Sequence, residues 1–181
     1  MKKVLLILAE GFEEIEALGT ADVLRRLDFA VTLAGLTGRN VTGAHRMAVT
    51  ADTALENVVN EEFDAVILPG GMPGAANLDK SPLVDEVLKN AVAGDKVIGA
   101  ICAAPFILAK RGLLKDGKFT MYPGFEAELG GLQYTAAPAE TDGRIVTGKG
   151  PGAVFAFAGA LAGALGKAQE CEELYKGMFI D

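Results

Sequence analysis

The chain has 181 residues, half of them hydrophobic, which is enough to build the core of one domain without disulfide cross-links. Its 24 acidic and 17 basic residues give a net charge of −7, which argues against a nucleic-acid binder or a protein attracted to anionic membranes. We therefore expect one domain over residues 1–181, with no specific nucleic-acid partner and no membrane association.

The amino terminus is predicted as a strand and not as an export signal. Met1, Lys2 and Lys3 run directly into VLLILAEG, an apolar run too short for a signal-peptide core with a cleavage site. The apolar stretch at 153–165 is about seven residues too short to span a membrane. Two cysteines and no secretory signal indicate a reducing compartment, so we expect a cytoplasmic protein.

Short apolar runs alternate with helical stretches along the chain. Strands are predicted at 3–9, 30–36, 64–70, 96–102 and 144–150, with weaker candidates at 47–50, 119–121 and 133–138. Helices are predicted at about 13–27, 81–93, 103–112 and 151–165. Continuous Val, Ile and Leu runs between helices are typical of a mostly parallel sheet covered on both faces. The sequence therefore predicts an α/β fold with its site beyond the carboxyl ends of the strands.

The first helical stretch places one acid on its inward face. The period that puts Val23 and Leu27 in the core also puts Glu16 there. Burial penalises a charged carboxylate, so the pKa of Glu16 should rise and leave a neutral acid able to donate a hydrogen bond. The alternative is that Glu16 is a solvated acid at the start of the helix. Glu13 and Glu14 suit the positive end of the helix and need not point inward.

A glycine-rich turn, LPGGMPGAANL at 68–78, follows the third strong strand. The N–H groups of Gly70 and Gly71 can point at a ligand there, as an oxyanion hole requires. No phosphate-binding GxxxxGK[ST] motif is present, and GKGPGA at 148–153 is one residue short of the GxGxxG spacing. The alternative is that both stretches are tight turns that end strands.

Cys102 ends the fourth strong strand, in VIGAICAAPF, and its neighbours are small. Ala100 and Ala104 flank it at two residues on either side; these small residues fit a nucleophile elbow between a strand and a helix, although the usual elbow has glycines there. A helix beginning at Ala103 would point its N–H groups and its dipole at the sulfur and lower the thiol pKa. The alternative is a buried core cysteine.

The second thiol and the only imidazole are expected to be less important. Cys171 lies among acids in QECEELYKG, which should raise its pKa, so we interpret it as incidental. His45 and two cysteines far apart in sequence make a poor set of zinc ligands. No metal and no other cofactor are therefore expected.

Four motifs occur in order along the chain: EGFEEIEA, ILPGGMPGAANL, AICAAP and GKGPG. Together they resemble the ThiJ/PfpI superfamily, and within it the DJ-one branch of the Parkinson-associated deglycase and chaperone. The resemblance covers essentially the whole chain. It implies a flavodoxin-like three-layer α/β sandwich that usually forms a homodimer. It also implies that Cys102 is an oxidation-sensitive nucleophile and that Glu16 is the acid bonded to its thiol.

The resemblance also assigns the surroundings of the thiol. The glycine amides of a small oxyanion pocket fall on Gly70 and Gly71, with the N–H of Ala103 beside them. Arg46 falls on an arginine that in relatives lies near the site across the dimer contact. Two further regions near that interface correspond to Arg26 and the turn at 150–152.

Two departures from the resemblance bear on the chemistry. Tyr122, in TMYPG, stands where many relatives carry a histidine, and we expect it to contribute to the substrate site. Ala103 directly follows the cysteine, where protease-like relatives have a histidine. Because His45 precedes Cys102 and no histidine follows it, a Cys–His protease or amidotransferase is not expected.

These residues fit two functions. The first is a cofactor-free enzyme on small reactive carbonyls: the Cys102 thiolate attacks methylglyoxal, N–H groups stabilise the oxyanion, and Glu16 moves a proton before hydrolysis releases lactate. The same site could remove early glycation adducts from proteins or nucleotides. The second is an oxidative-stress sensor or redox-regulated chaperone, without turnover, in which Cys102 becomes a sulfinate. We favour the enzyme.

Overall fold

A seven-stranded sheet lies at the centre of the computed structural model, which describes residues 1–180. Its strand order is β5-β2-β1-β6-β7-β9-β8. The strands are β1 (Lys3–Leu8), β2 (Ala30–Gly35), β5 (Thr53–Ala54), β6 (Ala65–Leu68), β7 (Val97–Ile101), β8 (Ala139–Asp142) and β9 (Ile145–Gly148). All neighbours pair in parallel except β8 and β9. The predicted α/β fold is confirmed, since the five strong strand predictions correspond to β1, β2, β6, β7 and β9.

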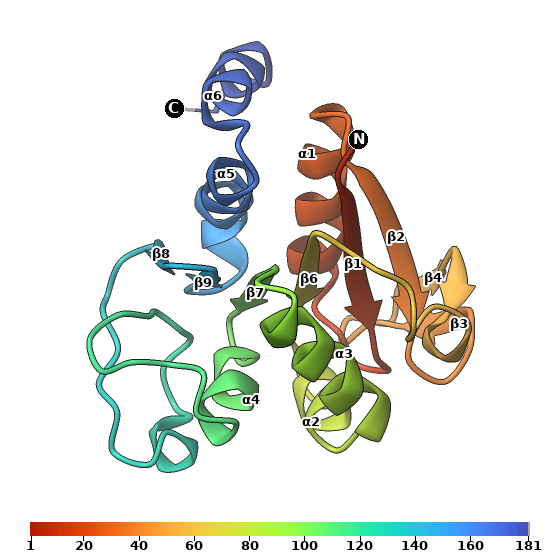
Figure 1. The fold of residues 1–181 in the computed structure, drawn as a ribbon, viewed down its shortest axis with the longest axis vertical. Helices are drawn as coiled ribbons and strands as arrows, with labels where there is room; N and C mark the ends of the chain where they lie inside the picture. Colours follow the sequence, from red (N-terminus) through yellow and green to blue (C-terminus); the bar gives the residue numbers. More distant parts are fainter. Residues whose placement is uncertain (181) are drawn as a thin grey trace.

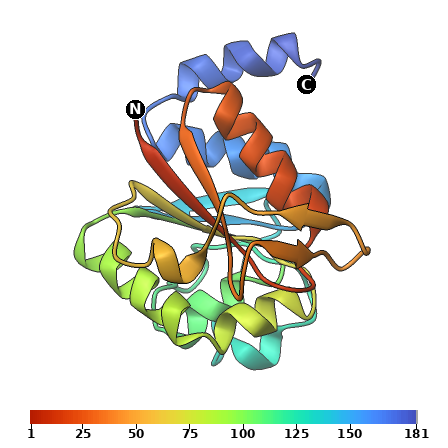
Figure 2. The ribbon, with the colours of Figure 1, turned by 90° about the vertical axis from the view of Figure 1, so that its right-hand side faces the viewer.

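The alternation of side chains along β1 separates two hydrophobic cores. Leu6 and Leu8 belong to one core, and Leu5 and Ile7 belong to the other, because successive side chains of a strand point to opposite faces. The first face is covered by α1 (Thr20–Arg26), α5 (Val154–Ala164) and α6 (Ala168–Gly177). The second is covered by α2 (Gly74–Asp79), α3 (Pro82–Ala93) and α4 (Pro105–Lys110). Figures 1 and 2 show these two groups of helices on opposite sides of the sheet.

The observed elements differ from the predicted ones where the chain turns sharply. The stretch predicted as one helix at 13–27 is a π-helical turn, η1 (Ile15–Gly19), followed by α1. The helix predicted from 103 begins only at Pro105, after a turn through Cys102. Likewise, a 3-10 turn, η4 (Pro151–Ala153), precedes α5.

The weaker strand candidates had mixed outcomes. The one at 47–50 is β4 (Ala48–Thr50), which pairs with β3 (Asn40–Thr42) in a separate hairpin. The candidates near 120 and 135 form only an isolated bridge between Thr120 and Thr135. Seven further elements within residues 1–180 were not predicted: the strands β3, β5 and β8, the helices α2 and α6, and the 3-10 turns η2 (Leu55–Asn57) and η3 (Glu126–Glu128).

The sheet topology indicates where a site can form. In the sheet, β2 lies on one side of β1, whereas β7 lies on the opposite side of β6. The direction in which the chain adds strands therefore reverses between the neighbouring strands β1 and β6. Ligands of open α/β sheets bind beyond the carboxyl ends of the strands at such a point. Glu16 follows β1, Gly70 follows β6 and Cys102 follows β7. Within residues 1–180, no helix has the length and apolar character needed to cross a membrane.

Candidate active site

Cys102 lies at a strained turn directly after β7. Its φ of 64° is in the left-handed region, which costs a residue with a side chain about 1–3 kcal/mol. The Cys102 N–H donates to the carbonyl of Gly148 at 2.9 Å, and its carbonyl accepts from the N–H of Tyr122 at 2.9 Å. Ala100 and Ala104 are fully buried on either side. The predicted elbow is confirmed, and these hydrogen bonds hold it from two directions.

Glu16 is buried at the start of η1, with no exposed surface. Its Oε2 accepts the N–H of Gly70 at 2.8 Å. Its Oε1 is also buried and meets no N–H or O–H donor among residues 1–180, whereas the Cys102 thiol lies within hydrogen-bonding reach of the carboxyl. Val23 and Leu27 are buried on the same side, so the inward orientation predicted for Glu16 is confirmed.

The pKa of Glu16 is raised to about 7. Burial is the main cause, and the nearby charge of Glu13 adds to it, against hydrogen bonds from Cys102 and from the Gly70 N–H. The predicted direction is therefore confirmed. A carboxyl group with this pKa can both give and take a proton at neutral pH.

The pKa of the Cys102 thiol is raised, so the predicted lowering is wrong. Burial is the largest cause, followed by the charge of Glu16 and the hydrogen bond to it; the N–H groups of Ala103 and Gly71 act in the opposite direction. The expected helix effect fails because α4 starts three residues after the thiol. The repulsion by Glu16 disappears when a proton moves onto that carboxyl, so loss of the thiol proton and protonation of Glu16 are coupled.

The two glycines after β6 have different surroundings. The Gly70 N–H is bonded to Glu16 and is not free for an oxyanion, whereas the Gly71 N–H points at the Cys102 sulfur together with that of Ala103. A Cβ at Gly70 would lie 2.6 Å from the Cys102 Cβ and 2.7 Å from Glu16 Oε2. Gly71 has a φ of 86°, which favours glycine. Glycine at both positions thus lets the turn approach the thiol closely.

The other residues expected at the site lie farther from the thiol or contact it only through the backbone. The Tyr122 ring is half-exposed and packs against Gly150. Arg46 lies in the β3–β4 loop with a φ of 68°, and its side chain makes no hydrogen bond or ion pair within residues 1–180. Arg26 pairs with Asp22 on the exposed side of α1 at 2.7 Å. The structure therefore brings Cys102 and Glu16 together with the glycine turn, but not with the two arginines.

Cys171 is buried in α6, away from this cluster. Its pKa is raised mainly by burial and also by Glu172, against a hydrogen bond with Tyr175. The acids that the sequence suggested as the cause are therefore a smaller effect than burial.

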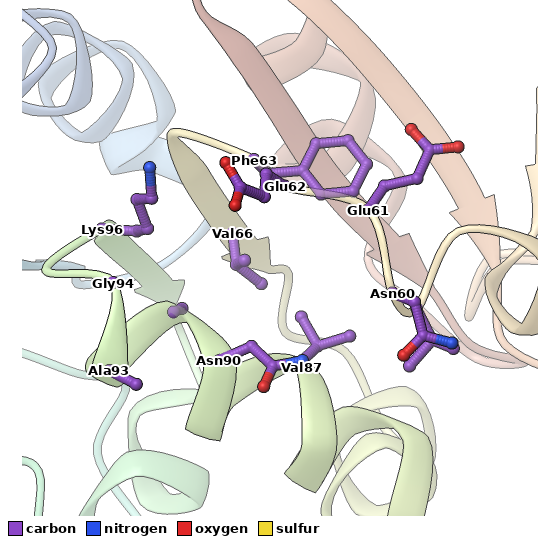
Figure 3. A pocket seen from close by; sticks show the side chains of 12 residues that line it. Asn60, Glu61, Glu62, Phe63, Val66, Val87, Asn90, Ala93, Gly94 and Lys96 are labelled. Carbon is purple, nitrogen blue, oxygen red and sulfur yellow. The ribbon is translucent and has the colours of Figure 1, made fainter.

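A cleft of about 310 Å³ lies at the opposite end of the sheet from Cys102, near the amino-terminal ends of β6 and β7 (Figure 3). Val66 of β6 and Val87 of α3 line it, together with Asn90 and Lys96. None of the residues that line it belongs to the Cys102 cluster. We assign the chemistry to the Cys102 end because the paired acid and thiol lie there.

Two functional contacts were not foreseen from the sequence. Glu13 is buried, and its Oε2 accepts the N–H of Glu16 at 2.8 Å, which fixes the start of η1. Glutamate at position 13 does not match the Ser, Thr, Asp or Asn of a capping box, so no sequence signal indicated this contact. Glu14 is also buried and binds His45, 31 residues away, for which no local signal exists.

Comparison with known proteins identifies relatives of this chain by sequence and by structure. The model of the DJ-1/PfpI family matches residues 2–164. Protein dj-1beta of Drosophila melanogaster is 38% identical over 183 residues, which cover 99% of this chain and 97% of that protein. Its crystal structure covers 99% of this chain and 98% of its own, with a TM-score of 0.94.

Two relatives carry names that state an activity. A glutathione-independent glyoxalase of Caenorhabditis elegans, DJR-1.2, is 34% identical over 98% of this chain and 95% of its own. A deglycase of Pyrococcus abyssi is 31% identical over 86% of this chain and 94% of its own.

Proposed function

Because the chain belongs to the DJ-1/PfpI family, we propose that it is a cofactor-independent cysteine enzyme acting on small reactive carbonyls, as a glutathione-independent glyoxalase or a deglycase. One observation carries the proposal. The buried Glu16 carboxyl is fixed through Oε2 by the Gly70 N–H, and it lies beside a thiol held at a strained elbow. This arrangement supplies a nucleophile and a proton carrier in one place.

The first step adds the Cys102 sulfur to the aldehyde carbon of methylglyoxal. The thiol proton passes to Glu16 as the carbon–sulfur bond forms, and the carbonyl oxygen becomes the hydroxyl of a hemithioacetal after protonation. The N–H groups of Gly71 and Ala103 lie beside the sulfur and suit a developing oxyanion. The Gly70 N–H stays on Glu16 and keeps its carboxyl oriented.

The second step transfers a proton between neighbouring carbons. Glu16 removes the proton from the former aldehyde carbon and returns one to the former ketone carbon, so that the first carbon is oxidised and the second reduced. The product is a lactoyl thioester on Cys102. Water then breaks the carbon–sulfur bond and releases lactate and the free thiol. The overall reaction consumes one water and no external oxidant or reductant.

The test is the conversion of methylglyoxal without glutathione or added metal, with lactate measured as the product. We expect catalytic lactate formation by the wild type, and none by Cys102→Ser or Glu16→Gln. Cys171→Ser is the matched control, because it removes the other buried thiol and should leave the rate unchanged. If the wild type forms no more lactate than Cys102→Ser, methylglyoxal conversion is wrong; release of free amine from a glycated peptide would then show deglycation instead.

We also propose that the chain acts as a homodimer. The proposal is supported by two exposed apolar side chains near the β3–β4 loop, Ile15 and Met47. Arg46 lies beside Met47 and would reach the site of a partner, as the sequence resemblance implies. Sedimentation equilibrium of the wild type and of Ile15→Glu tests this: a wild-type dimer that dissociates in the variant supports it, and a wild-type monomer overturns it.

A further inference from the structure

Three side chains outside the Cys102–Glu16 pair converge between the β1–η1 turn and the β3–β4 loop. They are Glu13, Glu14 and His45, and one ligand atom from each lies within 4.8 Å of the others. His45 Nδ1 is 2.8 Å from Glu14 Oε2 and 3.8 Å from Glu13 Oε1. No local pattern groups these three residues, because His45 follows the acids by more than thirty residues.

Each carboxylate is anchored by a backbone N–H through one oxygen, and its other oxygen is the one nearest the His45 ring. Glu13 Oε2 accepts the N–H of Glu16 at 2.8 Å, and Glu14 Oε1 accepts the N–H of His45 at 2.7 Å. The remaining oxygens, Glu13 Oε1 and Glu14 Oε2, are therefore the ones that face His45 Nδ1. Backbone hydrogen bonds of this kind orient the ligands of metal sites.

The cluster also contains two largely buried carboxylates, of which Glu14 is the better compensated: despite its burial, which raises its pKa, hydrogen bonds from His45 and from backbone N–H groups hold that pKa below the ordinary value. The Glu13 side chain is only 9% exposed, and its Oε1 accepts no hydrogen bond from any donor in residues 1–180. Glu14 is 3% exposed, while the imidazole that faces both acids is 65% exposed and carries a charge only when protonated. A carboxylate oxygen on a largely buried side chain is costly when no donor contacts it, and a cation beside Glu13 Oε1 would offset that cost.

We propose that Glu13, Glu14 and His45 form a binding site for a divalent transition metal of the Zn²⁺ type. One imidazole nitrogen and two carboxylate oxygens are ligands of this class, at about 2.0–2.2 Å from the metal, whereas Mg²⁺ and Ca²⁺ prefer oxygen alone. Ligand atoms around such an ion lie about 3–3.5 Å apart. The observed separations of 2.8 Å and 3.8 Å require small movements only. The ion replaces the proton between His45 and Glu14, and the three side chains supply its protein ligands.

Zn²⁺ binding to a thiol-free site tests the proposal. Zn²⁺ alone is titrated by calorimetry into the Cys102→Ser variant, which lacks the active-site thiol that could itself bind Zn²⁺. The same titration is repeated with the double variant that carries both Cys102→Ser and His45→Gln. We expect one Zn²⁺ per chain in the first protein. Loss of a direct ligand should weaken binding by more than about tenfold, the least that losing an outer partner of a ligand costs.

The matched control is Glu61→Gln with Glu62→Gln, which removes two adjacent acids that are exposed elsewhere on the molecule. Its Zn²⁺ affinity should not change. The melting temperature is a second measurement: Zn²⁺ should raise it for Cys102→Ser but not after His45→Gln. The proposal is overturned if Cys102→Ser binds no Zn²⁺ up to millimolar concentration. It is also overturned if His45→Gln leaves the affinity unchanged.

Discussion

The N–H of Gly70 donates a 2.8 Å hydrogen bond to Oε2 of Glu16, a residue 54 positions earlier in the chain. This contact joins the turn after β6 to the turn after β1, across the point where the sheet reverses its winding. It uses the amide that sequence reasoning assigned to the oxyanion pocket. Gly70 therefore acts on the proton carrier, and the oxyanion is left to the N–H groups of Gly71 and Ala103.

Gly70→Ala tests this arrangement directly. The added Cβ would lie 2.6 Å from the Cys102 Cβ and 2.7 Å from Glu16 Oε2, so the thiol and the carboxyl must move apart. We expect kcat/KM for methylglyoxal to fall by about a hundredfold or more, since a small displacement of reacting groups has that effect. Overpacking should also lower the free energy of unfolding by about 1–3 kcal/mol.

The control for that variant is Gly177→Ala, at the end of α6, where an added Cβ meets no atom within 4 Å. It should leave both kcat/KM and stability nearly unchanged. Wild-type turnover in Gly70→Ala would contradict the role assigned to the close approach.

Tyr122→His introduces the histidine that the sequence resemblance implies at this position. The Tyr122 N–H is bonded to the carbonyl of Cys102 at 2.9 Å, so a side chain here is held close to the elbow. A histidine adds a second group able to transfer protons, and we expect kcat/KM for methylglyoxal to rise by about tenfold or more. Steady-state rates of the wild type and the variant measure this.

Tyr122→Phe removes the phenol hydroxyl and keeps the aromatic ring. It should leave the rate close to that of the wild type, because the hydroxyl makes no hydrogen bond within residues 1–180. A large loss in Tyr122→Phe would show that the hydroxyl itself takes part in the reaction. An unchanged rate in Tyr122→His would place this side chain outside the proton-transfer path.

The sequence predicted the parts of this fold that depend on local pattern. The apolar runs identified β1, β6 and β7, and helical period identified the inward orientation of Glu16. Small neighbours identified the elbow at Cys102, and its φ of 64° confirms it. Each of these signals lies within a few residues of the feature that it predicts.

The pKa of Cys102 could not be predicted in the same way. Its direction depends on burial and on Glu16, which reaches the thiol only through the pairing of strands far apart in sequence. The pairing of Glu14 with His45 has the same origin, since the β3–β4 loop folds back onto the turn after β1. Helix bounds near Cys102 were also wrong, because the strained turn delays α4 until Pro105.

Glycine substitutions at the two cysteines measure the backbone strain at Cys102. Cys102 has a left-handed backbone, where replacement by glycine relieves about 1–2 kcal/mol. Cys171 lies inside α6, where glycine costs about 1 kcal/mol. Both side chains are buried, so the loss of packing is similar. Cys102→Gly should therefore be more stable than Cys171→Gly by about 2 kcal/mol in urea unfolding.

Cys102→Ala and Cys171→Ala are the controls for this comparison, because alanine removes each sulfur without the conformational freedom of glycine. At position 102 the glycine variant should have a higher free energy of unfolding than the alanine variant, and at position 171 it should have a lower one. If glycine is less stable than alanine at both, the backbone at Cys102 stores no strain.

Asp79 should make the stability of the chain depend on pH. It ends α2 and accepts hydrogen bonds from Arg111 Nη1 at 2.8 Å and Lys110 Nζ at 3.0 Å. Burial raises its pKa, but these bonds and charges outweigh burial, so the pKa lies below its ordinary value. A folded-state pKa below the unfolded one adds stability that is complete above the unfolded pKa and is lost as the pH falls through the folded pKa.

Asp79→Asn should therefore be less stable than the wild type at pH 7, by about 1–3 kcal/mol. The difference should shrink as the pH falls below about 4, where Asp79 itself becomes protonated in the unfolded chain and then in the folded one. Urea unfolding at a series of pH values measures it. Asp95→Asn is the matched control: its 3.2 Å pair with Arg144 is highly exposed and should contribute less than about 1 kcal/mol at any pH. If the difference in free energy of unfolding between Asp79→Asn and the wild type stays constant down to pH 2, the ion pair is not the source of that difference.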